Sequence, residues 1–251
     1  MKSKKVCVIG AGVSAIACLK ELAEKNIAAE SFEMMPILGG VFANYAWKDG
    51  HFTSSSIFTW FSDEPVKDRQ KFFKWDELLS YLALYIDKHQ LTPNIHLNCK
   101  VTSVVKSDNG WTVTVHKKNW SNGHYFHPKQ AVEEQVFTRK YSDIIVSSGL
   151  HNVPVTPSIQ GLDSFSGVKG HSCDYREAHP YKDKTVVVVG GGESASDIAK
   201  QVSQVAKSCY ISLRSAPGTL FPSFIQGNTA DIRDDLITYN LSRVWKSFIL
   251  R

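Results

Sequence analysis

Residues 6–15 of the chain read Val-Cys-Val-Ile-Gly-Ala-Gly-Val-Ser-Ala, and this stretch decides the fold. Its apolar residues predict a buried strand, and the residues after the glycines predict a helix that leads to a second apolar run ending at Glu33. Gly10 permits a tight turn, Gly12 lets a pyrophosphate approach the backbone, and Ala15 replaces a third glycine where helix and strand pack closely. The helix N-terminus then faces the phosphates, and Glu33 accepts hydrogen bonds from a ribose. Together these features predict a dinucleotide site rather than a purely structural turn.

A second stretch of the same kind begins at residue 185 and reads Thr-Val-Val-Val-Val-Gly-Gly-Gly-Glu-Ser-Ala. Gly190 and Gly192 repeat the glycine spacing of the first turn, and Ser194 opens the predicted helix. The apolar run after this helix ends in Arg214, with no acid at that point. The planar fork of an arginine pairs with a ribose 2′-phosphate, which an acid would repel. The second site is therefore predicted to prefer a nucleotide that carries a 2′-phosphate.

The composition is that of a globular protein, with 43% apolar and 21% charged residues. A net charge of +5 slightly favours anionic ligands, but the dense basic run is confined to residues 2–5, so nucleic-acid binding is not indicated. The five cysteines show neither a C-x-x-C pair nor metal-ligand spacing, which favours a reducing compartment and no metal. The N-terminus lacks a signal-peptide core, and no apolar run approaches membrane-spanning length. These features predict a cytoplasmic protein with no nucleic-acid or membrane partner.

The middle of the chain predicts a helix and then a β-meander. Apolar residues recur at helical spacing over residues 75–90. Residues 97–105 and 111–115 alternate between apolar and polar around a turn signal at 108–110, and the chain returns through 141–146. The polar arm of this meander carries histidines, which are better explained as solvated surface than as metal ligands. They are His116, His124 and His127.

Two loops leave alternatives open. Residues 34–42 contain paired glycines and form either an ordinary connector or a loop whose backbone approaches a flat or charged ligand. Residues 51–68 are rich in hydroxyls and aromatics and form either a packed loop or the wall of a planar ring site.

A domain boundary is predicted near residues 150–165. The strand before it ends in Ser147-Ser148-Gly149, where small residues suit close packing against a nucleotide, and prolines at 154 and 157 suit a crossing between domains. The sequence thus predicts an α/β protein with two Rossmann-like, doubly wound parallel-sheet domains and a β-meander in the first. Their expected ranges are 1–155 and 156–251.

Between the two glycine turns, residues 165–175 read Phe-Ser-Gly-Val-Lys-Gly-His-Ser-Cys-Asp-Tyr. This matches F-x-G-x-x-x-H-x-x-x-Y, the sequence by which flavin-containing monooxygenases are identified. The chain resembles that family along essentially its full length, in the order FAD fold, motif and NADPH fold. Taken alone, His171 is better explained by a structural hydrogen bond than by catalysis, and the resemblance gives it a linking role between the domains.

The resemblance implies two nucleotide cofactors, FAD and NADPH. It assigns to FAD the residues Gly10, Gly12, Val13, Ser14, Glu33, Gly40, Val41 and Phe42, and to NADPH the residues Gly190, Gly192, Ser194 and Arg214. In such enzymes NADPH reduces the flavin, and dioxygen then gives a flavin hydroperoxide whose distal oxygen passes to a nucleophilic nitrogen or sulphur. The implied function is a flavin-dependent, NADPH-using monooxygenase that acts on a small amine or thioether.

Two departures from the family pattern are visible. Many members carry an asparagine near the flavin, and the best alignment of residues 56–60 puts Trp60 there, although an indole donates one hydrogen bond and accepts none. The chain also ends at Arg251, whereas family members return from the NADPH domain to complete the FAD domain. We therefore expect a further segment or a second chain to complete the FAD domain. Without it, water would reach the flavin, and NADPH oxidation would yield mainly hydrogen peroxide.

Two other functions remain open from the sequence. The first is a flavoprotein reductase or oxidase that consumes NADPH without oxygenating a substrate, although the missing C-x-x-C pair argues against the disulphide-reductase branch. The second is a non-catalytic remnant or subunit that binds a nucleotide or a partner chain. A flavin absorption spectrum and NADPH oxidation would separate the second function from the enzymes.

Overall fold

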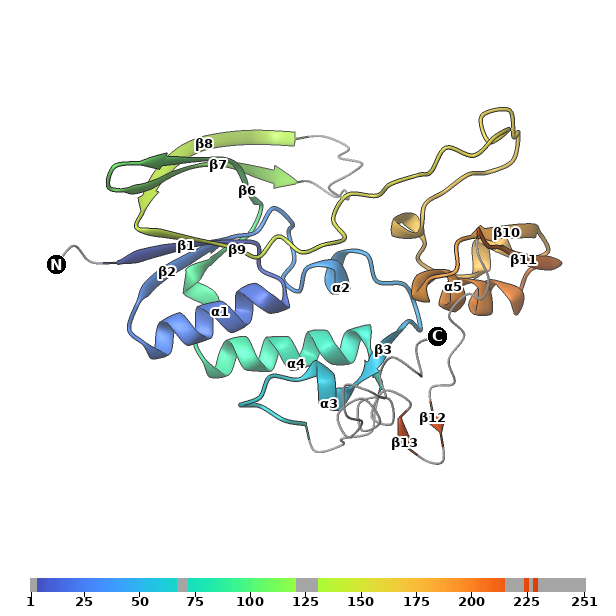
Figure 1. Cartoon of the computed structure of the whole chain (residues 1–251), viewed down its shortest axis with the longest axis horizontal. Coiled ribbons are helices and arrows are strands. Elements are labelled where there is room, and N and C mark those ends of the chain that lie inside the picture. Colours follow the sequence, from blue (N-terminus) through green and yellow to red (C-terminus); the bar gives the residue numbers. More distant parts are fainter. Residues whose placement is uncertain (1–3, 67–71, 121–130, 215–223, 226–227, 230–251) are drawn as a thin grey trace, which may run out of the picture. The chain divides into compact units, whose positions relative to one another are not determined.

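The computed structural model of the chain describes residues 4–66, 72–120, 131–214, 224–225 and 228–229 (Figure 1). The chain divides into two compact units: unit 1 comprises Met1–Ala46 and Asp76–Gly167, and unit 2 comprises Trp47–Trp75 and Val168–Arg251. Residues 47–75 pack with the C-terminal part of the chain in this division, and the domain ranges 1–155 and 156–251 stay a prediction. Unit 1 also continues to residue 167.

Unit 1 is built on a parallel sheet with the strand order β5-β2-β1-β9. Its strands are β1 (Lys5–Ile9), β2 (Ala28–Phe32), β5 (Ile95–His96) and β9 (Asp143–Val146). The central strand β1 pairs in parallel with β2 and β9, and its residues Val6, Cys7 and Val8 are buried. Burial on both faces explains why β1 reads as a continuous apolar run.

Two helices of unit 1, α1 (Val13–Glu24) and α4 (Trp75–Lys88), lie on one side of this sheet, and the meander lies on the other (Figure 1). Helix α1 buries Ala15, Ile16 and Leu19 at helical spacing. Helix α4 confirms the helix predicted over residues 75–90, with a buried face that includes Leu78, Tyr81, Leu82, Tyr85 and Ile86. It ends at Lys88, and Gln90 has a φ of 52° in the left-handed region, which a continuing helix excludes.

The meander has the antiparallel order β6-β7-β8, from β6 (Cys99–Ser107), β7 (Gly110–Trp120) and β8 (Ala131–Tyr141). Its inner face packs on the sheet in a core formed by Cys7, Phe32, Cys99, Val113, Val115 and Tyr141. The predicted meander is therefore confirmed, with longer arms than expected. His116 lies on its outer surface, where its Nδ1 is 2.5 Å from Oε1 of Glu134 on the neighbouring strand. His124 and His127 lie outside the described residues.

Unit 2 contains a parallel pair of strands, β10 (Thr185–Val189) and β11 (Ser208–Ser212), joined by helix α5 (Glu193–Ser203). Its core includes Tyr175, Ile198 and Val202. The inserted segment forms the antiparallel pair β3 (His51–Ser55) and β4 (Phe72–Lys74), with the short helix α3 (Ser56–Thr59) between them.

The remaining elements are short. Helix α2 covers Val41–Asn44, 3₁₀ turns cover Thr92–Asn94, Ser172–Asp174 and His179–Tyr181, and a two-stranded hairpin is formed by β12 (Phe224–Ile225) and β13 (Asn228–Thr229). Each unit thus carries one strand, glycine turn, helix and parallel strand. This confirms the predicted fold class.

Candidate nucleotide sites

The first glycine turn is shaped by Gly10, which follows β1. Gly10 has a φ of +106°, and a Cβ there would lie 2.4 Å from the carbonyl oxygen of Ser147. Its amide donates to the carbonyl of Phe32 at 2.8 Å, which joins the carboxyl ends of β1 and β2. Both the conformation and the space exclude a side chain. The tight turn predicted at Gly10 is therefore present.

Gly12 and Gly40 face each other across a space without side chains. A Cβ on Gly12 would lie 3.7 Å from the Cα of Gly40, and a Cβ on Gly40 would lie 3.3 Å from the Cα of Gly12. The two loops are joined by the amide of Gly39, which donates to the carbonyl of Ala11 at 3.2 Å. We call this pair of backbones the glycine cradle. The sequence predicted each glycine separately but not that they would meet.

Helix α1 begins at the glycine cradle. Gly12 is its N-cap, without a side-chain cap, and the amide of Ile16 donates to the carbonyl of Gly12 at 3.1 Å. The amides of Val13 and Ser14 precede this bond, so they have no acceptor within the helix. A helix N-terminus beside bare backbone fits an anionic pyrophosphate, which supports the FAD assignment of these residues.

Glu33 has a role that the sequence did not predict. Its buried carboxylate accepts a hydrogen bond from the amide of Ala11 at Oε2 (2.7 Å) and from the amide of Met35 at Oε1 (2.8 Å). Glu33 therefore holds the first glycine turn against the end of β2. A carboxylate has about four acceptor positions, so two remain for a ribose.

The remaining residues assigned to FAD lie in and beside helix α2 of unit 1. Gly40 caps α2, where its carbonyl accepts from Asn44 Nδ2 at 2.8 Å, and Val41 and Phe42 form the start of that helix in unit 1. Trp60 lies in unit 2 directly after α3, where its amide donates to the carbonyl of Ser56 at 3.1 Å. Its predicted place beside the flavin ring stays a prediction.

The second glycine turn repeats the geometry of the first. Gly190 has a φ of +127°, and its amide donates to the carbonyl of Ser212 at 2.9 Å, which joins the carboxyl ends of β10 and β11. Gly192 is the N-cap of α5, and a Cβ on it would meet no described atom within 4 Å. Ser194 is in the first turn of α5. This open helix N-terminus fits a second dinucleotide.

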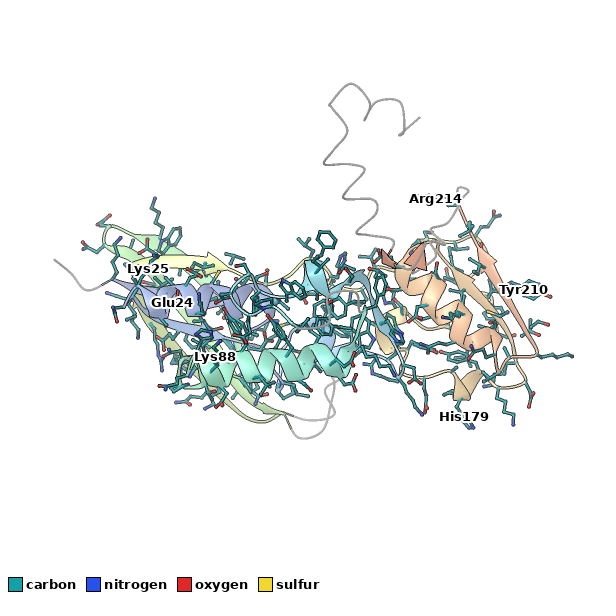
Figure 2. All side chains as sticks on the ribbon, turned by 90° about the horizontal axis from the view of Figure 1, so that it is seen from below. Glu24, Lys25, Lys88, His179, Tyr210 and Arg214 are labelled. Atoms are coloured by element: carbon teal, nitrogen blue, oxygen red, sulfur yellow. The ribbon has the colours of Figure 1, made fainter. Side chains whose placement is uncertain are left out.

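Arg214 follows β11 by two residues at the same edge of the parallel pair as the second turn. It is exposed, and Figure 2 labels it beyond the strand that carries Tyr210. Glu193 in the first turn of α5 puts one negative charge beside the helix N-terminus.

The motif residues His171 and Tyr175 have structural partners within unit 2. His171 Nδ1 accepts from the amide of Cys173 at 3.1 Å and caps the turn Ser172–Asp174. Tyr175 is buried and donates to Gln201 Oε1 on α5 at 2.9 Å. Burial, with smaller contributions from Tyr181 and Asp197, raises the pKa of Tyr175 to about 12. The linking role predicted for His171 stays a prediction.

Sequence reasoning missed Trp47, which begins the inserted segment. Its Nε1 donates to Asp197 Oδ2 on α5 at 2.6 Å, and its ring centroid is 5.5 Å from that of Trp75 and 6.1 Å from that of Tyr175. The start of segment 47–75 is thus bound to the helix of the second turn, and Trp75 at its end packs against Trp47. A lone tryptophan in a loop carries no periodic signal that could have predicted this contact.

The described part of the chain shows neither a membrane-spanning helix nor a metal-binding cluster. None of its helices combines the length and apolar character needed to cross a bilayer. Within the same residues, no group of three or more His, Cys, Asp or Glu side chains is placed to hold a metal ion.

Comparison with known proteins identifies the family. A family model described as flavin-binding monooxygenase-like matches residues 3–233. A 4-hydroxybenzoate brominase (decarboxylating) from Pseudoalteromonas luteoviolacea is 37% identical over 217 residues, which cover 86% of this chain and 39% of the brominase. Flavin-containing monooxygenase 3 from Rattus norvegicus is 31% identical over 229 residues, which cover 84% of this chain and 40% of that enzyme.

A solved structure has a similar fold. Tmm from Pelagibacter sp. strain HTCC7211 superimposes with a TM-score of 0.74 at 23% identity, over 90% of this chain and 54% of Tmm. The chain thus spans about two fifths of the length of these curated relatives and about half of the solved one.

Proposed function

Because the chain belongs to the flavin-binding monooxygenase-like family, we propose that it forms the FAD- and NADPH-binding part of a flavin-dependent monooxygenase. The observation that carries this proposal is the glycine cradle, since Gly12 and Gly40 leave bare backbone beside the open N-terminus of α1. The second glycine turn, with Arg214 beside it, supplies the matching site for NADPH. FAD, when bound, would supply the redox chemistry that links oxidation of NADPH to activation of dioxygen.

In the FAD site, the residues of unit 1 bind and orient the cofactor. The glycine cradle and the amides of Val13 and Ser14 would hold the pyrophosphate, and Glu33, which holds the turn in place, would accept the ribose hydroxyls. Val41 and Phe42 follow Gly40 at the start of α2 and would lie beside the cofactor. In the NADPH site, the amides after Gly192 would hold the pyrophosphate and Arg214 would pair with the 2′-phosphate.

The substrate class is a nucleophilic nitrogen or sulphur of a small amine or thioether, with dioxygen as co-substrate. The test is a product balance on purified protein with FAD and NADPH: nucleotide consumed, against peroxide and N- or S-oxide formed. Oxide in proportion to nucleotide supports the proposal. Mainly peroxide is the outcome expected of the chain without its completing segment, so peroxide without oxide would contradict the substrate class only when that segment or second chain is present. Absence of a flavin spectrum after FAD is added would point to a non-catalytic subunit.

A second candidate reaction is bromination of a phenol. It is favoured by the 37% identity to the decarboxylating 4-hydroxybenzoate brominase, against 31% to flavin-containing monooxygenase 3. The same assay with 4-hydroxybenzoate and bromide separates the two reactions, because a brominated product requires bromide and an N- or S-oxide does not. The cytoplasmic location and the completing segment or second chain stay predictions.

A further inference from the structure

A pocket of about 540 Å³ opens in unit 1, where strand β5 meets the inner face of the meander. Its lining includes Lys117 and Arg139 from the meander and His96 from β5. Apolar surface comes from Ile95, Leu97 and Phe137. No residue assigned above to FAD or NADPH lines this pocket, so it needs a separate explanation.

The lining has a surplus of positive charge. Lys117 and Arg139 line the pocket, and no acidic side chain does so within the described residues. The nearby carboxylate is Glu30, which accepts from Arg139 Nη1 and His96 Nε2 at Oε2, and from Lys5 Nζ (2.7 Å) and Tyr141 Oη (2.5 Å) at Oε1. The single carboxylate of Glu30 therefore pairs with two permanent cations, Lys5 and Arg139, and Lys117 adds a third positive charge nearby.

The pKa of Glu30 reflects the positive charges around it. Burial alone would raise the pKa of its carboxyl group, but hydrogen bonds from Lys5 and Tyr141 and the charge of Arg139 outweigh burial and lower the pKa to about 2. Glu30 thus stays ionised and neutralises only one of its cations. A guanidinium has five donors, so Arg139 can hold Glu30 and still face an anion in the pocket.

The apolar side of the pocket indicates the shape of a ligand. The guanidinium carbon of Arg139 lies 4.9 Å from the centre of the Phe137 ring, so a cation and an aromatic face are adjacent in the lining. Ile95 and Leu97 extend this apolar surface. An anion with a flat or apolar body would satisfy both kinds of surface, whereas a bare inorganic ion would satisfy only the charge.

We propose that this pocket binds a small organic anion, whose carboxylate or phosphate lies beside Lys117 and Arg139 and whose apolar body lies against Ile95, Leu97 and Phe137. The site is separate from the nucleotide sites and does not depend on the proposed monooxygenase function. Carboxylates and phosphate monoesters share the chemistry that the pocket recognises, and the probes below distinguish them.

The test is calorimetric titration of the full chain with benzoate, phenyl phosphate, their neutral analogue benzamide, and inorganic phosphate, in the presence of saturating FAD. Benzoate or phenyl phosphate should bind, more weakly at higher salt, and benzamide and inorganic phosphate should bind at least about tenfold more weakly than the better of the two. Preference between benzoate and phenyl phosphate identifies the anionic group. No binding of either at millimolar concentration would overturn the proposal, and so would equal binding of benzamide.

A matched pair of variants locates the site. Lys117→Gln should weaken binding of the preferred probe by about tenfold. Lys118→Gln makes the same change one residue later, where the side chain instead lies 3.5 Å from Glu134 Oε1, and it should leave binding unchanged. If Lys117→Gln and Lys118→Gln weakened probe binding equally, the probe would not bind in this pocket. Loss of probe binding when FAD is added would show that the pocket belongs to the flavin site.

Discussion

At the residue scale, Gly10 and Gly12 are required for different reasons. Gly10 is needed by the protein itself, because its positive φ and the nearby carbonyl of Ser147 leave no place for a Cβ. Gly12 has an ordinary φ of −80°, and a Cβ there would make only an ordinary contact with Gly40. Only a ligand in the glycine cradle would require Gly12 to be glycine.

The first prediction follows from this contrast. Gly12→Ala should leave the melting temperature close to that of the original chain but weaken FAD binding by at least about tenfold, because the new methyl group occupies the cradle. Gly10→Ala is the control, and it should lower the melting temperature clearly. Thermal unfolding and flavin titration measure both effects. Undiminished FAD binding by Gly12→Ala would show that the cradle is merely structural.

The second prediction concerns the choice between NADPH and NADH. Arg214→Ala should weaken the binding of NADPH by about tenfold or more and the binding of NADH much less. The reason is that only NADPH carries the 2′-phosphate that the guanidinium is proposed to bind. Arg214→Lys keeps the charge and should restore part of the preference. Dissociation constants for both nucleotides test this. An equal loss for both would remove Arg214 from the site.

At the element scale, Glu30 ties strands together. It lies in the middle of β2 and binds Lys5 on β1 together with Arg139 and Tyr141 on β8, so one carboxylate joins the parallel sheet to the meander. Burial and the hydrogen bond to Glu30 also raise the pKa of Tyr141, which keeps that phenol a donor. The elements of unit 1 are therefore held by a charged network as well as by their apolar core.

The third prediction is a pH dependence of stability. The folded pKa of Glu30 is about 2 against an ordinary 4.5, so its contribution is present above 4.5 and is lost as the pH falls towards 2. Because Lys5 and Arg139 are part-exposed, we expect this contribution to be about 2 kcal/mol. Glu30→Gln should remove this contribution at neutral pH. The free energy of unfolding, measured with urea at several pH values, should then fall less between pH 4.5 and pH 2 than it does in the original chain. Glu134→Gln, at an exposed carboxylate, should change little, and an unaltered fall in Glu30→Gln would contradict the assignment.

At the scale of the whole molecule, the two nucleotide folds were predicted from the sequence, and the attachment of residues 47–75 was not. Glycine turns and apolar runs are local signals, so Gly10, Gly190 and the alternating strands of the meander were readable from the sequence. The attachment of residues 47–75 to unit 2 involves the hydrogen bonds from Trp47 to Asp197 and from the amide of Lys48 to the carbonyl of Arg176, together with ring contacts, and none of these has a sequence period. The hydrogen bonds from the amides of Ala11 and Met35 to Glu33 could not be predicted from the sequence either, because the folded turn brings these amides to the carboxylate.

The fourth prediction tests that attachment. Trp47→Phe keeps an aromatic ring but removes the donor to Asp197, and it should destabilise the protein by about 1–2 kcal/mol. Asp197→Asn and the double variant complete a thermodynamic cycle in urea unfolding, and a coupling energy of about 1 kcal/mol is expected. Strictly additive effects would show that the hydrogen bond contributes nothing.

The chain passes between its two units three times, after Ala46, after Trp75 and after Gly167. This interleaving determines which segments must be exchanged together in a chimera of the protein and a relative. A chimera made by exchanging only residues 168–251 would leave a native Trp47 facing a foreign helix, with no assurance of an acid at the position of Asp197. A transplanted nucleotide fold therefore has to bring residues 47–75 with it, and its helix partners have to be chosen together with that segment.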